Sequence, residues 1–182
     1  MINKKFLKPL LGTLLTFAII IGGITLFKGS NHVFAKYYYW NGYSKQNAQD
    51  WEGAIEDYSK VLEYDNGFVT AYISRGSAYV DLKQYVKAIS DYNIAIELTP
   101  NDAQIYAYRG RAFYETEKYG KAMSDYDRSL TLDNKFAYAY YNRGLLKYAI
   151  HMDFVSGCDD FFIASELGHD QATDVILNGD CD

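Results

Sequence analysis

The fold is decided by residues 72–100, YISRGSAYVDLKQYVKAISDYNIAIELTP. Small and aromatic residues recur here at helical spacing along two successive stretches, first Tyr72, Gly76 and Tyr79 and then Ala88, Tyr92 and Ala95. Small residues such as Gly76 and Ala88 let two helices approach closely, and large aromatic rings fill the neighbouring gaps. Pro100 and the polar turn after it end the second stretch. The segment therefore predicts a helix–turn–helix unit.

The same unit recurs along the chain with a period of 34 residues. The glycine position shows this most clearly, at Gly42, Gly76, Gly110 and Gly144. Alanine recurs at 54, 88 and 122, and an Asp-Tyr pair begins at 57, 91 and 125. In the fourth copy the frame slips by one residue, which gives Gly157, Asp160-Phe161 and Ala164. Several positions that keep one register indicate a stacked array. We expect helices near 36–48, 51–64, 69–82, 85–98, 103–116, 119–132, 137–150 and 154–167.

At these residues the chain resembles the tetratricopeptide repeat (TPR) family. The second unit matches the family pattern at Tyr72, Gly76, Tyr79, Ala88, Tyr92, Ala95 and Pro100. The third unit departs from the pattern at Ser129 and Asn134, and the first departs at Lys45 and Val61. The resemblance implies four units over 35–68, 69–102, 103–136 and 137–171, with a truncated capping helix over 172–182. It also implies an all-α fold, a right-handed superhelix whose concave face is lined by the first helix of each unit.

The N-terminal segment differs in character from the repeats. Residues 9–27 are nineteen residues without a charge, and a helix of this length is about 28 Å long, close to the thickness of the hydrocarbon layer of a bilayer. Three lysines precede this apolar run, so the positive-inside rule predicts a cytoplasmic N-terminus and extracytoplasmic repeats. We expect residues 1–28 to be a retained transmembrane anchor. The alternative is a signal sequence cleaved after Ala35, which would release a secreted protein.

Charge and composition exclude several classes of function. Residues 1–35 carry four lysines and no acid, whereas residues 36–182 carry 14 basic against 23 acidic side chains. Because phosphate backbones require clustered Lys and Arg, the acidic repeats are not expected to bind nucleic acid. Two cysteines among 182 residues are too few for a disulfide scaffold or a cysteine zinc site. The 19 tyrosines must serve packing or binding.

Catalytic and metal-binding patterns are absent from the sequence. The three histidines, His32, His151 and His169, are scattered, and no phosphate-binding loop or nucleophile elbow occurs. Asp159 and Asp160 are consecutive, so on a helix their side chains point about 100° apart and do not share one site. We therefore expect no enzyme activity, no cofactor and no metal.

A column of arginines and a column of aspartates follow the period. The arginines directly precede the glycine at Arg75, Arg109 and Arg143, and the aspartates are Asp57, Asp91 and Asp125. They could form a basic ladder for an anionic ligand or a structural ladder of ion pairs. Because the first unit has Asn41 in place of the arginine, the sequence favours structural pairing between neighbouring units, as Asp57–Arg75, Asp91–Arg109 and Asp125–Arg143.

The resemblance assigns the binding surface to residues of the first helices that packing does not require. These residues are Tyr39, Tyr43, Gln46, Ile73, Ser77, Val80, Ala107, Arg111, Tyr114, Tyr141 and Tyr148. Aromatic side chains are typical anchors for peptides, although each of these tyrosines could instead pack between units. Family members that bind the carboxylate tails of cytosolic chaperones use a Lys/Asn/Arg clamp. This chain has Tyr39, Tyr43, Ser74, Gln104 and Tyr108 there, so it is not expected to bind those tails.

Cys158 and Cys181 are predicted to form a disulfide. In this fold the position of Cys158 faces the capping helix, whose end is expected to return to the start of helix 154–167. An exported protein enters an oxidising compartment, where a cysteine pair within reach would close. The alternative is a buried Cys158 with Cys181 on a frayed tail.

These observations predict a non-catalytic, membrane-anchored scaffold that binds an unidentified peptide or protein in the concave groove, with residues 9–27 in the lipid bilayer. Two alternatives remain open from the sequence. One is a structural subunit that uses the array edge to build an envelope complex, and the other is a secreted soluble effector.

Overall fold

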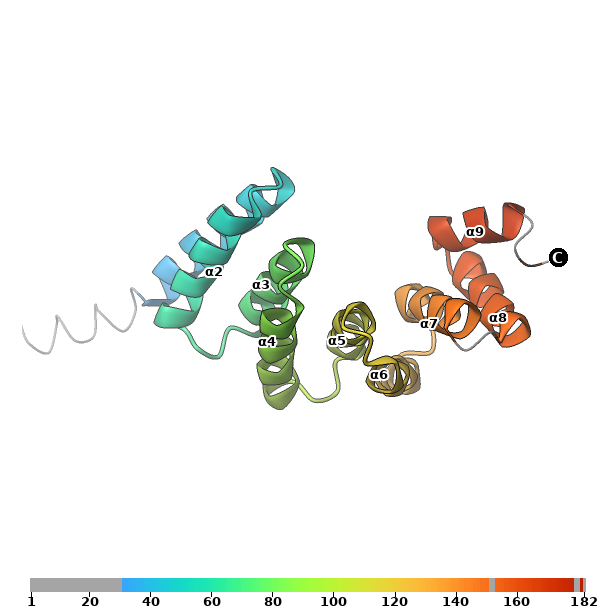
Figure 1. Ribbon diagram of the computed structural model, residues 1–182. Helices are drawn as coiled ribbons and strands as arrows, with labels where there is room; N and C mark the ends of the chain where they lie inside the picture. Colours follow the sequence, from blue (N-terminus) through green and yellow to red (C-terminus); the bar gives the residue numbers. More distant parts are fainter. Residues whose placement is uncertain (1–30, 151–152, 179–180, 182) are drawn as a thin grey trace, which may run out of the picture.

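The computed structural model describes residues 31–150, 153–178 and 181, and their regular structure is entirely helical (Figure 1). Residues 31–47 are helical and are followed by α2 (Trp51–Tyr64), α3 (Val69–Asp81), α4 (Tyr85–Leu98), α5 (Ala103–Glu115), α6 (Tyr119–Leu132), α7 (Ala137–Ala149), α8 (Phe154–Glu166) and α9 (Asp170–Leu177). The predicted anchor 1–28, with its apolar run 9–27, lies outside the described residues. Within the described part of the chain, no helix is long and apolar enough to cross a bilayer.

The helices form an array in which each packs mainly on its neighbours in sequence. The pairs α3/α4, α5/α6 and α7/α8 are joined by short turns, and each pair packs on the next. Figure 1 shows the successive pairs following an arc, with α2 near one end and α9 at the other. A chain of helix pairs that contact only adjacent pairs is a solenoid, which is the all-helical superhelix expected from the repeats.

The glycine period sets how closely the two helices of a pair approach. A Cβ atom placed on Gly76 would lie 2.7 Å from the Tyr92 ring, and one placed on Gly110 would lie 2.7 Å from the Tyr126 ring. These rings are almost completely buried. A side chain larger than hydrogen therefore has no room at this position, which explains the strict recurrence of glycine.

From α2 to α8 the helix ends lie within one residue of the predicted ones, whereas the first helix is described from residue 31, five residues before its predicted start at 36. Local side chains explain several of these ends. The side chains of Asp50, Asp102 and Asp153 accept hydrogen bonds from backbone N–H groups in the first turns of α2, α5 and α8. Gln49, Lys83 and Glu117 take the left-handed conformation, with φ of 60°, 57° and 59°, in the turns that join helices. Their spacing of 34 residues shows that the turn geometry repeats as well.

The last helix closes the array. α9 begins at Asp170, two residues before the predicted capping helix, and Ala172 packs with Phe161 and Ala164 of α8 in a buried cluster. The sulfur atoms of Cys158 and Cys181 are bonded, and the two Cα atoms are 5.5 Å apart. The predicted cysteine pair is therefore present, and it fastens the end of the chain to the first half of α8.

Candidate interaction surfaces

Each arginine of the column forms its two-bond ion pair with the aspartate of its own helix pair, and not with the column aspartate of the preceding unit. Arg75 donates to Asp91 through Nε and Nη2, at 2.8 Å and 2.7 Å, and Arg109 binds Asp125 in the same way at 2.8 Å. Arg143 pairs with Asp160 at 2.8 Å and 2.7 Å. The predicted pairing of Asp57 with Arg75, Asp91 with Arg109 and Asp125 with Arg143 is wrong. The physical reason is that the glycine next to each arginine brings the two helices of one pair closest together at this level.

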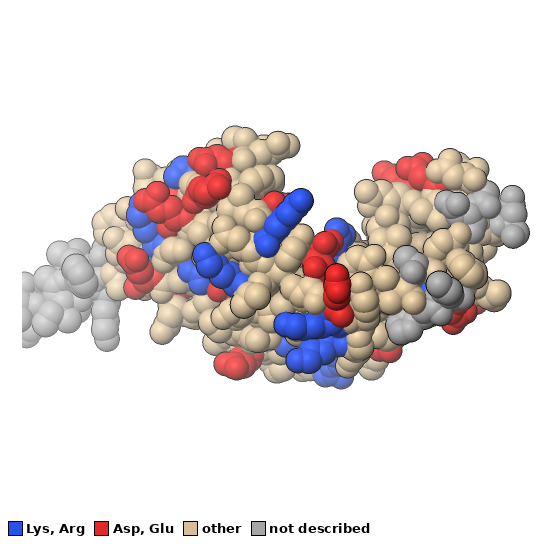
Figure 2. Space-filling model, in the orientation of Figure 1, with Lys and Arg blue, Asp and Glu red and all other residues tan. Residues whose placement is uncertain are grey.

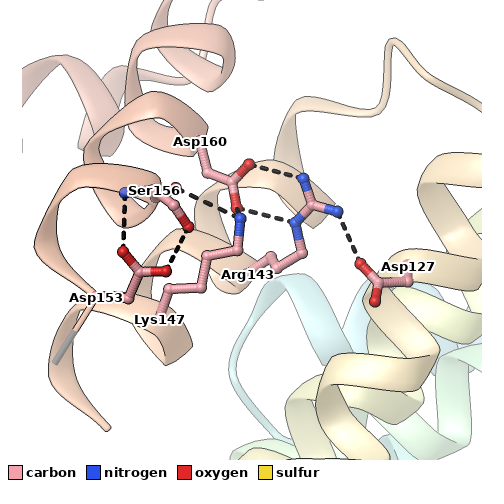
Figure 3. A network of polar contacts seen from close by, with 6 residues as sticks. All are labelled: Asp127, Arg143, Lys147, Asp153, Ser156 and Asp160. Carbon is pink, nitrogen blue, oxygen red and sulfur yellow. Dashed lines mark hydrogen bonds and ion pairs between the residues drawn. The ribbon is translucent and has the colours of Figure 1, made fainter. Parts of the chain in front are cut away.

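The remaining nitrogen of each arginine, Nη1, makes the contact with the preceding helix pair. Nη1 of Arg143 donates to Asp127 of the preceding pair at 2.7 Å, while its other nitrogens bind Asp160 (Figure 3). Ser59 accepts the corresponding bond from Arg75, and Asn93 accepts that from Arg109. This column does not stand out in the sequence because its members are a serine, an asparagine and an aspartate. The detectable signal was their common ability to accept a hydrogen bond, at a spacing of 34 residues.

Lysines also bind members of the aspartate column, in the first helix pair and in the last. In the first pair Asn41 replaces the arginine, and Lys45 Nζ lies 2.7 Å from Asp57. In the last pair Lys147 Nζ lies 2.9 Å from Asp160, which therefore faces two cations (Figure 3). Burial opposes the charge of Arg143, but its hydrogen bonds to Asp160 and Asp127 prevail and raise its pKa. The arginine nitrogens thus serve contacts inside the fold, which supports the structural interpretation of the ladder.

Residues of α3, α5 and α7, together with Tyr92 of α4, line a pocket. Its volume is about 230 Å³, and it is lined by Ser77, Val80, Tyr92, Tyr108, Arg111 and Tyr138. Figure 2 shows the molecule hollowed between the part that contains α2 and the part that contains α9. The rings of Tyr108 and Tyr138 meet edge to face with centroids 5.5 Å apart. The structure therefore brings together Ser77, Val80 and Arg111 from the predicted lining.

Several other predicted lining residues are engaged in packing. Ala107 is fully buried in the core, so its assignment to the groove is wrong, because its face of α5 packs inside the array. Tyr141 stacks on His169 with centroids 4.3 Å apart, and Tyr148 packs against Phe154 and Phe161. These two tyrosines serve the contact with α8 and α9.

Most of the remaining predicted lining residues are held by contacts with other side chains. Tyr39 contacts the rings of Tyr58 and Phe68, and Gln46 Oε1 accepts a 2.7 Å hydrogen bond from the Tyr58 hydroxyl. Ile73 packs partly in the core, and Tyr114 packs on Tyr119. Tyr43 is exposed. Sequence reasoning missed Tyr92 and Tyr138 as pocket residues, since the repeat pattern assigns the first to packing and the second lies outside it.

Electrostatics make the pocket almost neutral. Arg111 donates to Glu115 from Nε at 2.7 Å, and its Nη2 atom lies 2.7 Å from the same carboxylate. Burial opposes the charged form of Arg111, but the hydrogen bond and the charge of Glu115 raise its pKa. Burial also raises the pKa of Tyr138, which keeps the phenol protonated. The pocket thus presents aromatic surface, hydroxyl groups and one guanidinium whose charge is already balanced.

The described residues hold no group of three His, Cys, Asp or Glu side chains that could bind a metal ion. His32 is exposed and His169 stacks on Tyr141, while His151 lies outside the described residues. The ion pairs of the arginine column join packed helices, whereas the pair Arg111–Glu115 lies within α5.

Comparisons with known proteins agree with this geometry. Residues 76–116 and 110–150 each match the family model described as TPR repeat. MamA (residues 41–end) from Desulfovibrio magneticus RS-1 superposes with a TM-score of 0.67 at 22% identity, over 75% of this chain and 77% of that one. The array has the tetratricopeptide-repeat fold. A search of curated proteins finds no match.

Two further solved TPR domains are similar to this chain and contain peptides. The first TPR of Spaghetti (RPAP3), bound to the HSP90 peptide SRMEEVD, has a TM-score of 0.62 at 27% identity and covers 64% of this chain and 93% of that one. The second TPR domain of human RPAP3, in complex with the HSP70 peptide SGPTIEEVD, has a TM-score of 0.62 at 25% identity and covers 64% and 98%. TPR arrays similar to this one thus bind peptides, which supports a protein-interaction scaffold.

Proposed function

We propose that this protein is a non-catalytic, membrane-anchored scaffold that binds an extended peptide segment of a partner protein in the pocket of α3, α5 and α7. The observation that carries the proposal is the pocket itself, where Tyr108 and Tyr138 offer aromatic surface beside Ser77 and Arg111. Aromatic rings bury a large area at a small cost in conformational entropy and are frequent anchors for peptide side chains.

The chemistry of the pocket indicates the kind of peptide. The positions at which chaperone-binding relatives carry a clamp are Tyr39, Tyr43, Ser74, Gln104 and Tyr108 here, and none of these is cationic. Arg111 is bound by Glu115. Since Arg111, the cationic residue that lines the pocket, is paired with Glu115, we propose a partner segment with apolar or aromatic side chains and hydrogen-bonding backbone, distinct from acidic chaperone tails.

The proposed location is extracytoplasmic, with the N-terminus in the cytoplasm. The uncharged run 9–27 after Lys4, Lys5 and Lys8 supports an anchor. The bonded pair Cys158–Cys181 supports an oxidising compartment. Ala35 is fully buried against Val61 and Ala71, so a cut after it would remove part of the first packed helix. This observation favours a retained anchor over a secreted protein cleaved after Ala35.

Peptide-library selection followed by calorimetry tests the binding function. Ser77→Trp should fill the pocket and abolish binding of selected peptides while the helical circular dichroism is retained. Ser90→Trp is a matched control, because Ser90 is exposed on α4 and does not line the pocket. Binding that survives Ser77→Trp would favour the alternative of an envelope subunit that uses the array edge.

Fractionation tests the location separately. We expect the full chain to remain in the membrane pellet after a carbonate wash and to show no free thiol before reduction. Release into the supernatant with a mature N-terminus at Lys36 would favour the secreted effector, and two free thiols would contradict the oxidising compartment.

A further inference from the structure

The helix over residues 31–47 exposes a face to solvent. The corresponding face is buried in α3, α5 and α7, which are the first helices of the later pairs. Tyr37 is 59% exposed and Trp40 is 63% exposed. The residues one, two and three periods after Tyr37 are Ala71, Ile105 and Ala139, and each is 0% exposed, because these helices pack on a preceding pair. No described pair precedes residues 31–47, so the aromatic face stands at the end of the array.

This exposed face is aromatic and carries no negative charge. Val33 lies on the same side of the helix as Tyr37 and Trp40 and is 65% exposed, and the Trp40 ring meets that of Tyr43 edge to face. Terminal repeats normally present a polar outer face for solubility. Residues 31–47 contain two lysines and no acidic residue, whereas all 23 acidic residues of the chain lie beyond residue 47. This face is therefore complementary to a partner surface that is apolar and bordered by negative charge.

The sequence places an apolar run directly before this helix. Only Lys28, Gly29 and Ser30 separate the uncharged residues 9–27 from residue 31, and four peptide steps reach at most about 14 Å. If residues 9–27 span a bilayer, the helix starts at the headgroup layer, where Trp and Tyr are enriched. A Gly-Ser pair is a common site of sharp bends in helices, so Gly29-Ser30 allows the chain to turn there.

We propose that the helix over residues 31–47 lies on the extracytoplasmic surface of the bilayer, with Tyr37 and Trp40 in the interfacial layer and Lys36 against anionic headgroups. The inference rests on the anchor in the proposed function and adds a second membrane contact. Interfacial helices bind through an apolar face together with basic side chains that attract anionic lipids. Proximity and charge favour the bilayer over a second copy of the acidic protein. The end of the array is then held at the membrane, and the repeats extend from it.

Tryptophan quenching in vesicles tests the inference. The chain has two tryptophans, Trp40 and Trp51, so Trp51→Phe leaves Trp40 as the sole reporter. The full chain carrying this change is reconstituted into phosphatidylcholine/phosphatidylglycerol vesicles with lipids brominated at shallow or deep positions. We expect a blue-shifted emission that is quenched most strongly by the shallow bromines. The matched variant Trp40→Phe reports on Trp51 and should show much weaker quenching.

The outcomes separate this inference from the anchor on which it rests. A chain that floats with the vesicles while Trp40 stays unquenched retains the anchor and overturns the interfacial helix. A straight helix would give this result, because it would raise Trp40 about 20 Å above the end of the apolar run. A chain that does not float overturns both. Concentration-dependent burial of Trp40 without lipid, together with cross-linked dimers, would assign the face to a second copy.

A second reporter covers the case in which Trp51→Phe does not fold. Tyr37→Cys adds a single reactive thiol, because Cys158 and Cys181 are bonded to each other. A nitroxide on this cysteine should be more accessible to oxygen than to a polar nickel complex when the chain is in vesicles. Equal access to the polar reagent with and without lipid would overturn the inference.

Discussion

At the scale of single residues, one glycine in each helix pair faces an aromatic ring across the pair. Adding a methyl group normally stabilises a helix, because glycine loses more backbone entropy on folding than alanine. In this array the steric cost of the added methyl group is larger than this entropic gain, because the methyl group would meet a buried ring that has no space to move. The recurrence of glycine therefore reports a packing requirement and needs no ligand to explain it.

Gly110→Ala should lower the free energy of unfolding by about 1–3 kcal/mol, the usual cost of overpacking a core. The new Cβ would lie 2.7 Å from Cε1 of Tyr126, which is fully buried. Gly120→Ala is the matched control, because its Cβ would have no atom within 4 Å, and its stability should be unchanged or higher by up to about 1 kcal/mol. Urea unfolding of the two variants measures the difference. Equal stabilities would refute the packing argument.

The ion pairs predict which arginine and aspartate are energetically coupled. In a double-mutant cycle, Arg75→Ala and Asp91→Ala should be non-additive by on the order of 0.5–3 kcal/mol, because the two side chains share two hydrogen bonds. Asp91→Ala and Arg109→Ala should be additive within about 0.5 kcal/mol, since Arg109 binds Asp125 and Asn93. The reverse pattern in chemical denaturation would restore the pairing between units.

At the scale of elements, the period determines what could be predicted from the sequence. Helix positions followed from apolar spacing and turn residues, and these are local properties. The partner of Arg75 could not be predicted from local sequence. Asp57 and Asp91 lie at similar distances along the chain on either side of it, and only the packing of the helices decides between them. The same limit explains Ala107, whose position in the repeat suggested the groove while the rotation of α5 buries it.

The cap α9 should be sensitive to acid through His169. Burial lowers the pKa of His169, although the charge of Asp170 partly opposes this, and its buried Nδ1 atom has no hydrogen-bond partner among the described residues. The unfolded chain therefore binds a proton more readily than the folded one. The stability contributed by neutral His169 is complete above the ordinary pKa of about 6.5 and is lost as the pH falls below it.

Hydrogen exchange measures this effect at the level of the helix. After correction for intrinsic rates, amides of 170–177 should exchange faster at about pH 5.5 than at neutral pH, while those of α4 should change much less. His169→Phe preserves a ring against Tyr141 but cannot be protonated, so it should remove the pH dependence. A pH dependence that persists in this variant would point to another titrating group.

At the scale of the whole molecule, charge decides which peptides the array can accept. The chain has a net charge of −5, and all of its acidic residues lie beyond residue 47. An acidic peptide approaching the pocket is repelled by this charge, and the cationic residue that lines the pocket, Arg111, is already bound by Glu115. To bind such a peptide, Arg111 would have to release Glu115. Similarity in fold to the peptide-bound relatives therefore does not imply that this chain binds the same peptides.

The peptide SRMEEVD, which the similar RPAP3 domain binds, should therefore show no saturable binding to this chain. Fluorescence polarisation at low ionic strength is the strictest measurement, because salt would screen any attraction that exists. The RPAP3 domain is the positive control, and a peptide with Gln and Asn in place of Glu and Asp separates charge from shape. Saturable binding that weakens with salt and disappears in Arg111→Ala would contradict the prediction. Arg111 would then exchange Glu115 for a ligand carboxylate, and the pocket would be a latent anion site in place of a neutral aromatic one.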